Sequence, residues 1–255
     1  MPSSTLMRAQ RNKTEGGLFF KALFYKRKGS TYHCLSLFNA LMKTLAINSA
    51  LPLTEIALLE DGKVLMHKSW PSNYNEAEKL LPEIQKILQK HGQPDQIFAV
   101  QGPGAFTGLR VGITIANSLA YIFGVPIKTC TTFEYLDQKT PEQKRESTAI
   151  LMRAGSGVAV VLPNVEKVHK INKDELADFL AAAPHIKAVV SDVRSEAREN
   201  YQLPKGTKWL ELEALPDFAQ TVQAILESER TNHKVIKPQY LAPPHITKSK
   251  KQQFA

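Results

Sequence analysis

One segment limits what this chain can fold into more than any other: an apolar strand, a glycine-rich loop and a helix that follow one another without a break. Residues 96–100 have the composition of a buried strand, and Gly124 marks the end of the helix. The run between them, Gly-Pro-Gly-Ala-Phe-Thr-Gly-Leu-Arg-Val-Gly, occupies residues 102–112. Such a loop is typical of α/β proteins, and the helix N-terminus that it feeds presents backbone N–H groups that suit an anion.

The motif nevertheless matches known nucleotide-binding loops poorly. It lacks the Gly-Lys-Ser/Thr of a P-loop, and Thr107 stands where the dinucleotide fingerprint has its third glycine. The glycines therefore favour a tight turn over a phosphate site. The candidates for cofactor contact are Gly102, Gly104, Thr107 and Arg110. Three partners are open for Arg110: a phosphate, a carboxylate of another protein, or a salt bridge within its own domain.

A row of small residues runs along one side of the expected helix at four-residue intervals: Gly108, Gly112, Ala116 and Ala120. Small residues let another backbone approach closely. Each helical glycine costs about 1 kcal/mol relative to alanine, so two of them on one face require a packing or functional reason. From the residues alone the chain's own sheet or helix and a second protein are equally good partners for this row.

Strands and helices alternate through the rest of the chain. Asp61-Gly62 supplies the positive φ angles of a two-residue hairpin turn. The helix over 75–91 is expected to be capped by Asn75 with Glu78, to kink at Pro82 and to end at Gly92. Further strands are expected at 43–48, 55–60, 63–68, 148–152, 158–162, 167–171, 188–192 and 208–212, and helices at 174–182 and 215–229. This order predicts an α/β fold with a mixed sheet in each half, divided at a polar seam over 137–147.

The two ends of the chain differ from its middle. Residues 1–41 carry seven basic residues against Glu15, which accounts for +6 of the net charge of +9. We expect this leader to lie outside the fold, as an upstream sequence before Met42, a transit peptide or a basic arm that binds RNA. The expected domains are 42–140 and 141–241, followed by a basic tail at 242–255.

The composition limits the class of protein. Cys34 and Cys130 are too few for a disulfide framework and lack metal-ligand spacing, which favours a reducing, cytoplasmic setting. No uncharged apolar run reaches the roughly 18 residues that a membrane helix needs, so no membrane contact is expected.

The glycine motif resembles the signature of the TsaB/YeaZ family, a Gly-Pro-Gly-Ser-Phe-Thr-Gly-x-Arg run at the start of the second helix. Neighbouring segments agree with the family in order and spacing: residues 45–49, Leu80-Leu81-Pro82, Val125-Pro126-Ile127 with Thr131-Thr132, and Pro238-Gln239-Tyr240-Leu241. The resemblance covers residues 42–248 and is most specific over 42–136.

The resemblance implies an actin-like ATPase (RNase H-like) fold of two tandem α/β subdomains. It implies a non-catalytic scaffold subunit of the complex that transfers threonylcarbamoyl to the adenosine next to the anticodon of tRNAs reading A-starting codons. The implied partners are a catalytic TsaD-like subunit, a TsaE-like ATPase and a second copy of the chain, with tRNA bound only through the complex. Metal and nucleotide belong to the TsaD-like subunit, so no cofactor, metal or catalytic residue is expected here. The implied interface is formed by Leu80, Ile84, Leu88, Gly108, Gly112, Ala116 and Ala120.

Two departures from the family pattern argue against an autonomous enzyme, and a third indicates a divergent lineage. Asn48 replaces the aspartate of the first turn, and Glu76 with Lys79 occupies the region of the catalytic relative's His-x-x-x-His pair. Arg153-Ala154-Gly155 replaces Asp-Ala-Arg in the second half. Two alternatives to the scaffold remain: an autonomous actin-fold ATPase or peptidase, and a dimeric protein-binding module unrelated to tRNA.

Overall fold

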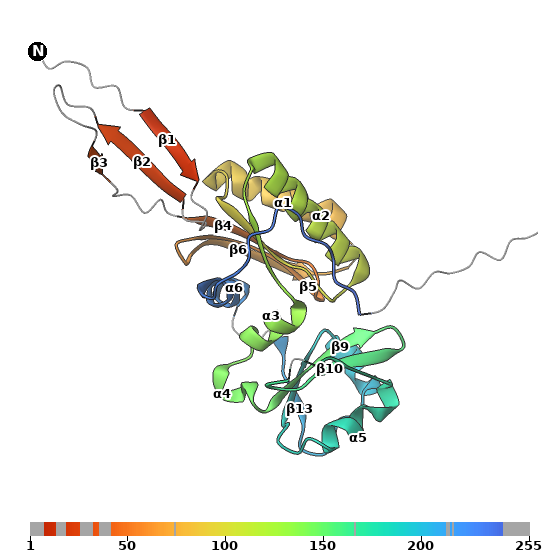
Figure 1. Cartoon of the computed structure of the whole chain (residues 1–255). Helices are drawn as coiled ribbons and strands as arrows, with labels where there is room; N and C mark the ends of the chain where they lie inside the picture. The colour runs from red at the N-terminus through yellow and green to blue at the C-terminus, as the bar shows by residue number, and fades with distance from the viewer. Residues whose placement is uncertain are drawn as a thin grey trace, which may run out of the picture. The chain divides into compact units, whose positions relative to one another are not determined.

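The structure is a computed structural model, and it divides the chain into two units, residues 1–42 and 43–255. Each unit is described here by itself (Figure 1). The described residues are 8–13, 19–25, 33–35, 42–73, 75–165, 167–212, 215 and 217–241. The predicted basic tail at 242–255 lies outside them.

The first unit contains three strands, β1 (Arg8–Lys13), β2 (Phe19–Tyr25) and β3 (His33–Leu35). They form an antiparallel sheet in the order β1-β2-β3. These strands were not predicted from the sequence, although the boundary at residue 42 agrees with the expected start of the main fold. The run Phe-Phe-Lys-Ala-Leu-Phe-Tyr of β2 is rich in the aromatic residues that favour strands, and the basic composition masked this signal.

The first sheet of the second unit has five strands in the order β6-β5-β4-β7-β8. The turn between β5 and β6 has positive φ at Asp61 (46°) and Gly62 (76°), which confirms the predicted hairpin. Strand β4 pairs antiparallel with β5 and parallel with β7. The strands are β4 (Lys43–Asn48), β5 (Leu53–Glu60), β6 (Lys63–Pro71), β7 (Gln96–Val100) and β8 (Ile127–Cys130).

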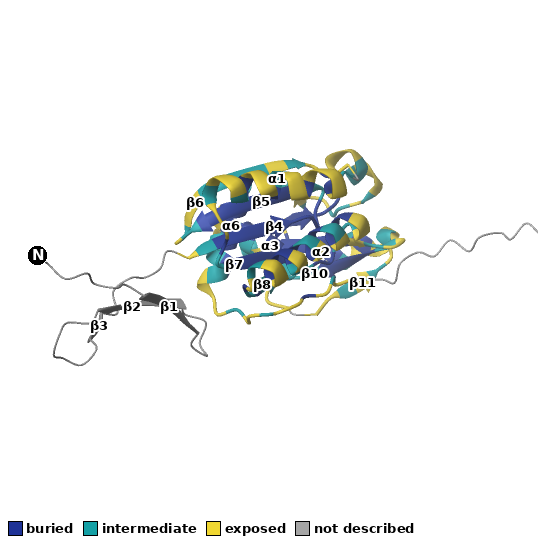
Figure 2. Ribbon diagram, turned by 90° about the horizontal axis from the view of Figure 1, so that it is seen from above, coloured by how far each residue is buried: buried dark blue, intermediate teal, exposed yellow. Residues whose placement is uncertain are grey.

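Two long helices, α1 (Glu76–His91) and α2 (Phe106–Phe123), contact each other and cover one face of this sheet (Figure 1). Helix α1 ends at Gly92 as predicted, but Asn75 forms no side-chain cap, so the expected capping box is absent. Two of its apolar residues, Ala77 and Leu81, are exposed. Figure 2 shows the buried strands beneath helices whose outer sides are exposed.

The opposite face of the first sheet is covered by α3 (Thr132–Lys139) and α6 (Phe218–Glu227). Neighbouring residues of β4 show the two faces, because successive strand residues point to opposite sides. Ile47 lies beside the α2 residue Gly112, whereas Asn48 reaches the side of the sheet that α3 covers. Helix α3 was not predicted.

The second sheet also has five strands, in the order β11-β10-β9-β12-β13. It forms a separate core with α5 (Leu176–Ala181). The predicted helix over 174–182 is divided into a 3-10 turn (Lys173–Glu175) and α5, and the predicted seam contains the short α4 (Glu142–Arg145). The strands are β9 (Thr148–Ala154), β10 (Gly157–Val161), β11 (His169–Ile171), β12 (Ala188–Ser191) and β13 (Lys208–Trp209); Ser195–Asn200 is a second 3-10 turn.

The C-terminal segment returns to the first sheet, which corrects the predicted domain 141–241. Phe218, Val222 and Ile225 of α6 are buried in the core of the first sheet. Residues 230–241, which we call the strap, then follow that sheet to the glycine loop, where the Gln239 N–H donates to the Gln101 carbonyl (2.8 Å). Local patterning predicts the type of an element but not which sheet it joins.

The small-residue row of α2 packs against the chain's own β4–β5 loop. A Cβ atom at Gly108 would lie 2.7 Å from the Ser49 carbonyl oxygen, and one at Gly112 would lie 2.0 Å from Ser49 Oγ. Ser49 Oγ donates a hydrogen bond to the Gly108 carbonyl (2.8 Å). The two helical glycines are therefore required by a contact within the chain.

Replacing a glycine within a helix by alanine usually stabilises a protein, but this contact predicts that the substitution destabilises it at Gly112. Gly112→Ala should destabilise the protein by about 1–2 kcal/mol, because overpacking outweighs the gain of about 1 kcal/mol in helix propensity. Combining it with Ser49→Ala should restore part of the loss, since the obstructing hydroxyl is removed. Urea unfolding measures both, with Thr114→Ala on the exposed side of α2 as the control. A Gly112→Ala protein as stable as the wild type would contradict the prediction.

The glycine loop and the outer face of helices α1 and α2

The glycine loop is closed by two other segments of the chain. A Cβ atom at Gly104 would lie 2.1 Å from the Ala50 carbonyl oxygen, and the Ala105 N–H donates to the same oxygen (2.9 Å). Gly102 has a φ of 103°, and a Cβ atom there would lie 2.6 Å from the Gln239 carbonyl oxygen. These glycines therefore permit close backbone approach, as the tight-turn interpretation expects.

Arg110 is held by aromatic rings at the end of the strap. Its Nε donates to Tyr240 Oη (2.8 Å), and its guanidinium carbon lies 3.8 Å from the centre of the Phe106 ring. Of the three partners considered, an intramolecular one is present, although it is a tyrosine rather than a carboxylate. Thr107 is exposed in the first turn of α2. That the chain needs no cofactor of its own stays a prediction.

The predicted interface residues lie mainly in the interior of the chain. Leu88 alone is half-buried, and the other six are buried: Leu80, Ile84, Gly108, Gly112, Ala116 and Ala120. They face the chain's own sheet, because the helices must bury their apolar and small sides to complete the core. The prediction for these six residues is corrected accordingly, because their side chains are not accessible to a partner.

Beside their buried sides, the two helices carry further apolar residues. Ile122 is 69% exposed and Leu81 is 39% exposed. Val111 and Ile115 lie about three and two turns before Ile122 on the same side of α2 and are half-buried, as Leu88 is on α1. We call these five residues the docking face. Apolar residues that remain exposed together on neighbouring helices are typical of a protein interface.

The apolar composition of α2 has to be compared with the expectation that the chain has no membrane-spanning helix. Within the described part of the chain, α2 is the one helix long and apolar enough to cross a membrane by length and composition alone. The sequence analysis expected no uncharged run of this kind, and α2 does contain Arg110. The packing of α2 onto the sheet accounts for its apolar composition.

On the other face of the sheet, a buried polar cluster surrounds Glu55. Its Oε2 accepts hydrogen bonds from Asn48 Nδ2 (3.3 Å) and Tyr135 Oη (3.1 Å), and its Oε1 lies 3.9 Å from His67 Nε2. Burial raises the pKa of the Glu55 carboxyl, and the charge of Lys139 together with the neighbouring donors opposes this rise. A carboxylate at position 48 would face Glu55, so asparagine suits this position better than the family's aspartate. The sequence signal for this cluster was an acid, Glu55, close to the start of the apolar strand β5.

Two further carboxylates, Glu76 and Asp192, are also engaged within the chain. Glu76 is 2% exposed and accepts a hydrogen bond from Ser72. Asp192 accepts bonds from the Arg153 backbone N–H (2.9 Å) and from Arg153 Nε (3.1 Å). Burial raises the pKa of Asp192, and the charge of Arg153 opposes this rise. Among the described residues, no three His, Cys, Asp or Glu side chains are grouped so that they could bind a metal ion.

The pKa of Glu55 predicts a pH-dependent stability. Because the folded-state pKa lies above the unfolded value near 4.5, ionisation of Glu55 opposes folding. The stability that Glu55 contributes is fully present below the unfolded pKa and is lost as pH rises through the folded pKa. The free energy of unfolding of the wild type should therefore fall relative to that of Glu55→Gln as the pH rises above 4.5. Urea unfolding measures this, with the exposed Glu142→Gln as the control; a constant difference would refute it.

Comparison with known proteins now identifies the family. A family model described as TsaD, tRNA N6-adenosine threonylcarbamoyltransferase, matches residues 72–239, which is more than half of the chain. The tRNA threonylcarbamoyladenosine biosynthesis protein TsaB of Bacillus subtilis is 29% identical over 99 residues, and the Escherichia coli protein of the same name is 33% identical over 102. These matches cover 37% and 38% of this chain and 43% of each relative, so they span less than half the length of the curated relatives.

Solved structures support the fold over a larger part of the chain. YeaZ from Pseudomonas aeruginosa is 21% identical with a TM-score of 0.55, and the match covers 79% of this chain and 100% of that one. A second structure from the same organism, an uncharacterized protein with similarity to peptidase YeaZ, has the same identity and coverage and a TM-score of 0.59. The fold is thus the actin-like ATPase fold of two α/β subdomains that the resemblance implied. The chain belongs to the TsaD family, and it is similar in sequence to TsaB proteins and in fold to YeaZ.

Proposed function

We propose that this chain is a non-catalytic scaffold subunit of an assembly that forms threonylcarbamoyladenosine in tRNA. The proposal takes the process from the names of the TsaB relatives. The observation that carries it is the docking face, an apolar surface on two helices whose inner sides are already filled by their own sheet. A surface of this kind suits stable binding to another protein.

The proposed partner is a TsaD-like catalytic subunit. A helix pair that presents one apolar stripe per helix can pack against an equivalent pair, because ridges of side chains interdigitate between helices. Leu81 and Leu88 lie seven residues apart on α1, and Ile115 and Ile122 have the same spacing on α2, which is the repeat that such packing uses. In this proposal the chain positions and stabilises its partner, while the metal, the nucleotide and the transfer chemistry belong to that partner.

Two further members of the assembly follow from the same proposal: a TsaE-like ATPase, and tRNA reading A-starting codons. A cytoplasmic setting fits this assembly. A second copy of the chain competes for the docking face, since an apolar surface can bind itself around a two-fold axis. The dimeric binding module unrelated to tRNA remains the second candidate, and the same surface favours it.

An autonomous ATPase or peptidase is a less favourable proposal. Its catalytic carboxylates would have to come from groups that are already engaged: Glu55 with Asn48 and Tyr135, and Asp192 with Arg153. Each would have to exchange its present partner for a substrate or a metal.

Co-purification of the full chain with the TsaD-like protein of the same organism tests the proposal. Ile122→Asp should weaken the complex at least about tenfold, because it buries a charge within the docking face. Val235→Asp is the matched control, since Val235 is 66% exposed on the strap and outside the docking face. Both variants should unfold at the same urea concentration as the wild type.

Three outcomes would count against the proposal. If a folded wild type does not bind at micromolar concentrations, the TsaD-like protein is excluded as the partner. If the wild type and Ile122→Asp bind equally well, the docking face is excluded as the site of binding. An equal loss in Val235→Asp shows that the effect is not specific to that face.

A further inference from the structure

Two long segments of this chain contain no acidic residue. One runs from Gln96 to Phe133 and includes β7, α2 and β8, and the other runs from Arg230 to the last residue and includes the strap. Acidic residues make up the usual counterpart of basic ones on a protein surface. Because neither segment contains an acidic residue, every charged side chain that these two segments contribute to the surface is basic.

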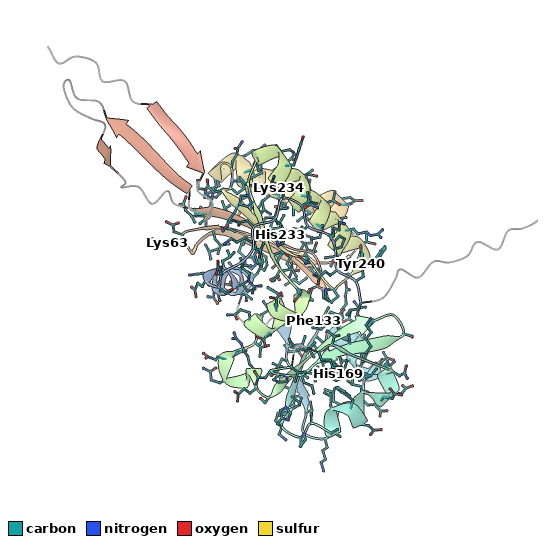
Figure 3. All side chains as sticks on the ribbon, in the orientation of Figure 1. Lys63, Phe133, His169, His233, Lys234 and Tyr240 are labelled. Carbon is teal, nitrogen blue, oxygen red and sulfur yellow. The ribbon has the colours of Figure 1, made fainter. Side chains whose placement is uncertain are left out.

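The structure brings the two segments side by side. His233 and Ile127 of β8 exchange backbone hydrogen bonds (2.8 and 2.9 Å). Farther along, the Asn117 side chain on α2 pairs with the backbone of Ile236 through two bonds of 2.9 Å. The strap ends at the glycine loop, where Tyr240 binds Arg110. Figure 3 labels His233, Lys234 and Tyr240 along this path.

Basic side chains lie along the whole length of the strap and its neighbours. Arg110, Lys234 and Lys237 are exposed, and Lys128 of β8 is half-buried. None of these four takes part in the ion pairs found among the described residues. By contrast, Arg230 at the start of the strap is paired with Glu134 (2.6 Å), which lies just beyond the acid-free segment.

Aromatic rings are interleaved with these charges. Tyr121 on α2 is 89% exposed, and Tyr240 and Phe106 are each 37% exposed. Tyr121 lies one turn after Asn117, so it is on the side of α2 that the strap follows. An exposed line of cations with accessible aromatic rings suits a nucleic acid, whose phosphates bind the cations and whose bases stack on the rings.

We propose that this surface, formed by the strap, β8 and the adjacent side of α2, binds tRNA directly within the assembly. The identity of the RNA rests on the proposed function, whereas the basic and aromatic surface does not. The surface is distinct from the docking face, because Asn117 and Ile115 are two residues apart and point to nearly opposite sides of α2. One helix then separates a protein partner on one side from RNA on the other. The sequence analysis expected tRNA to bind only through the complex, and this proposal changes that expectation.

The test compares two double variants of the full chain. Lys234→Glu with Lys237→Glu reverses two strap charges, and Lys205→Glu with Lys208→Glu reverses two exposed charges beside β13. Each protein is assembled with the TsaD-like partner, and the assembly is quantified by size-exclusion chromatography. Affinity for a fluorescent, unmodified tRNA transcript is then measured by anisotropy over a range of salt concentrations. Vesicles containing phosphatidylserine are measured in parallel.

We expect both double variants to assemble like the wild type. The strap variant should bind tRNA about tenfold more weakly or worse, and the slope of log K against log salt should fall by about 2, one unit for each lysine. The control variant should bind tRNA like the wild type.

The failures of the two proposals are distinguishable. If the assemblies form but the strap variant binds tRNA as tightly as the wild type, or the control loses as much, the tRNA surface is overturned and the scaffold stands. If binding to vesicles but not to tRNA depends on the strap, the surface binds lipid and the proposal is also overturned. If the wild type does not assemble, the scaffold fails, and the tRNA surface is decided by the same comparison on the isolated chain.

Discussion

The close approach between helix α2 and the β4–β5 loop determines much of this structure. Gly104, Gly108 and Gly112 each face the backbone or side chain of Ser49 or Ala50 at distances that exclude a Cβ atom. This contact turns the small-residue row of α2 inward, and the docking-face residues of α2 lie beside that row. The same contact holds the glycine loop in the position where the strap binds it. Both the docking face and the basic surface along the strap therefore depend on how α2 packs against the β4–β5 loop.

A glycine-rich loop before a helix is often read as a phosphate site, yet here its geometry follows from packing. The Ala50 and Gln239 carbonyl oxygens lie where side chains at Gly104 and Gly102 would be. The buried carboxylates are likewise engaged by neighbours, Glu55 by Asn48 and Asp192 by Arg153. A chain that uses its polar groups internally fits the proposed role of a scaffold, whose contribution to the assembly is surface and rigidity.

Local sequence patterns predicted the local structure well. Strands β4 and β7 begin and end at the predicted residues, and the Asp61-Gly62 hairpin forms, because these features depend on short-range periodicity and turn chemistry. Helix α3 was missed although Thr131 and Glu134 form a capping box before it. Three features depend on contacts between residues that are distant in the sequence, which no local pattern specifies. They are the partner of the small-residue row, the return of α6 to the first sheet and the path of the strap.

Hydrogen exchange of the full chain, with and without the TsaD-like partner, shows whether the partner covers the docking face. We expect slower amide exchange in peptides covering 81–91 and 111–123 when the partner is bound, and unchanged exchange in 176–181 of α5 on the second sheet. Protection confined to 176–181, or complex formation without any protection of α1 and α2, would contradict the assignment of the docking face.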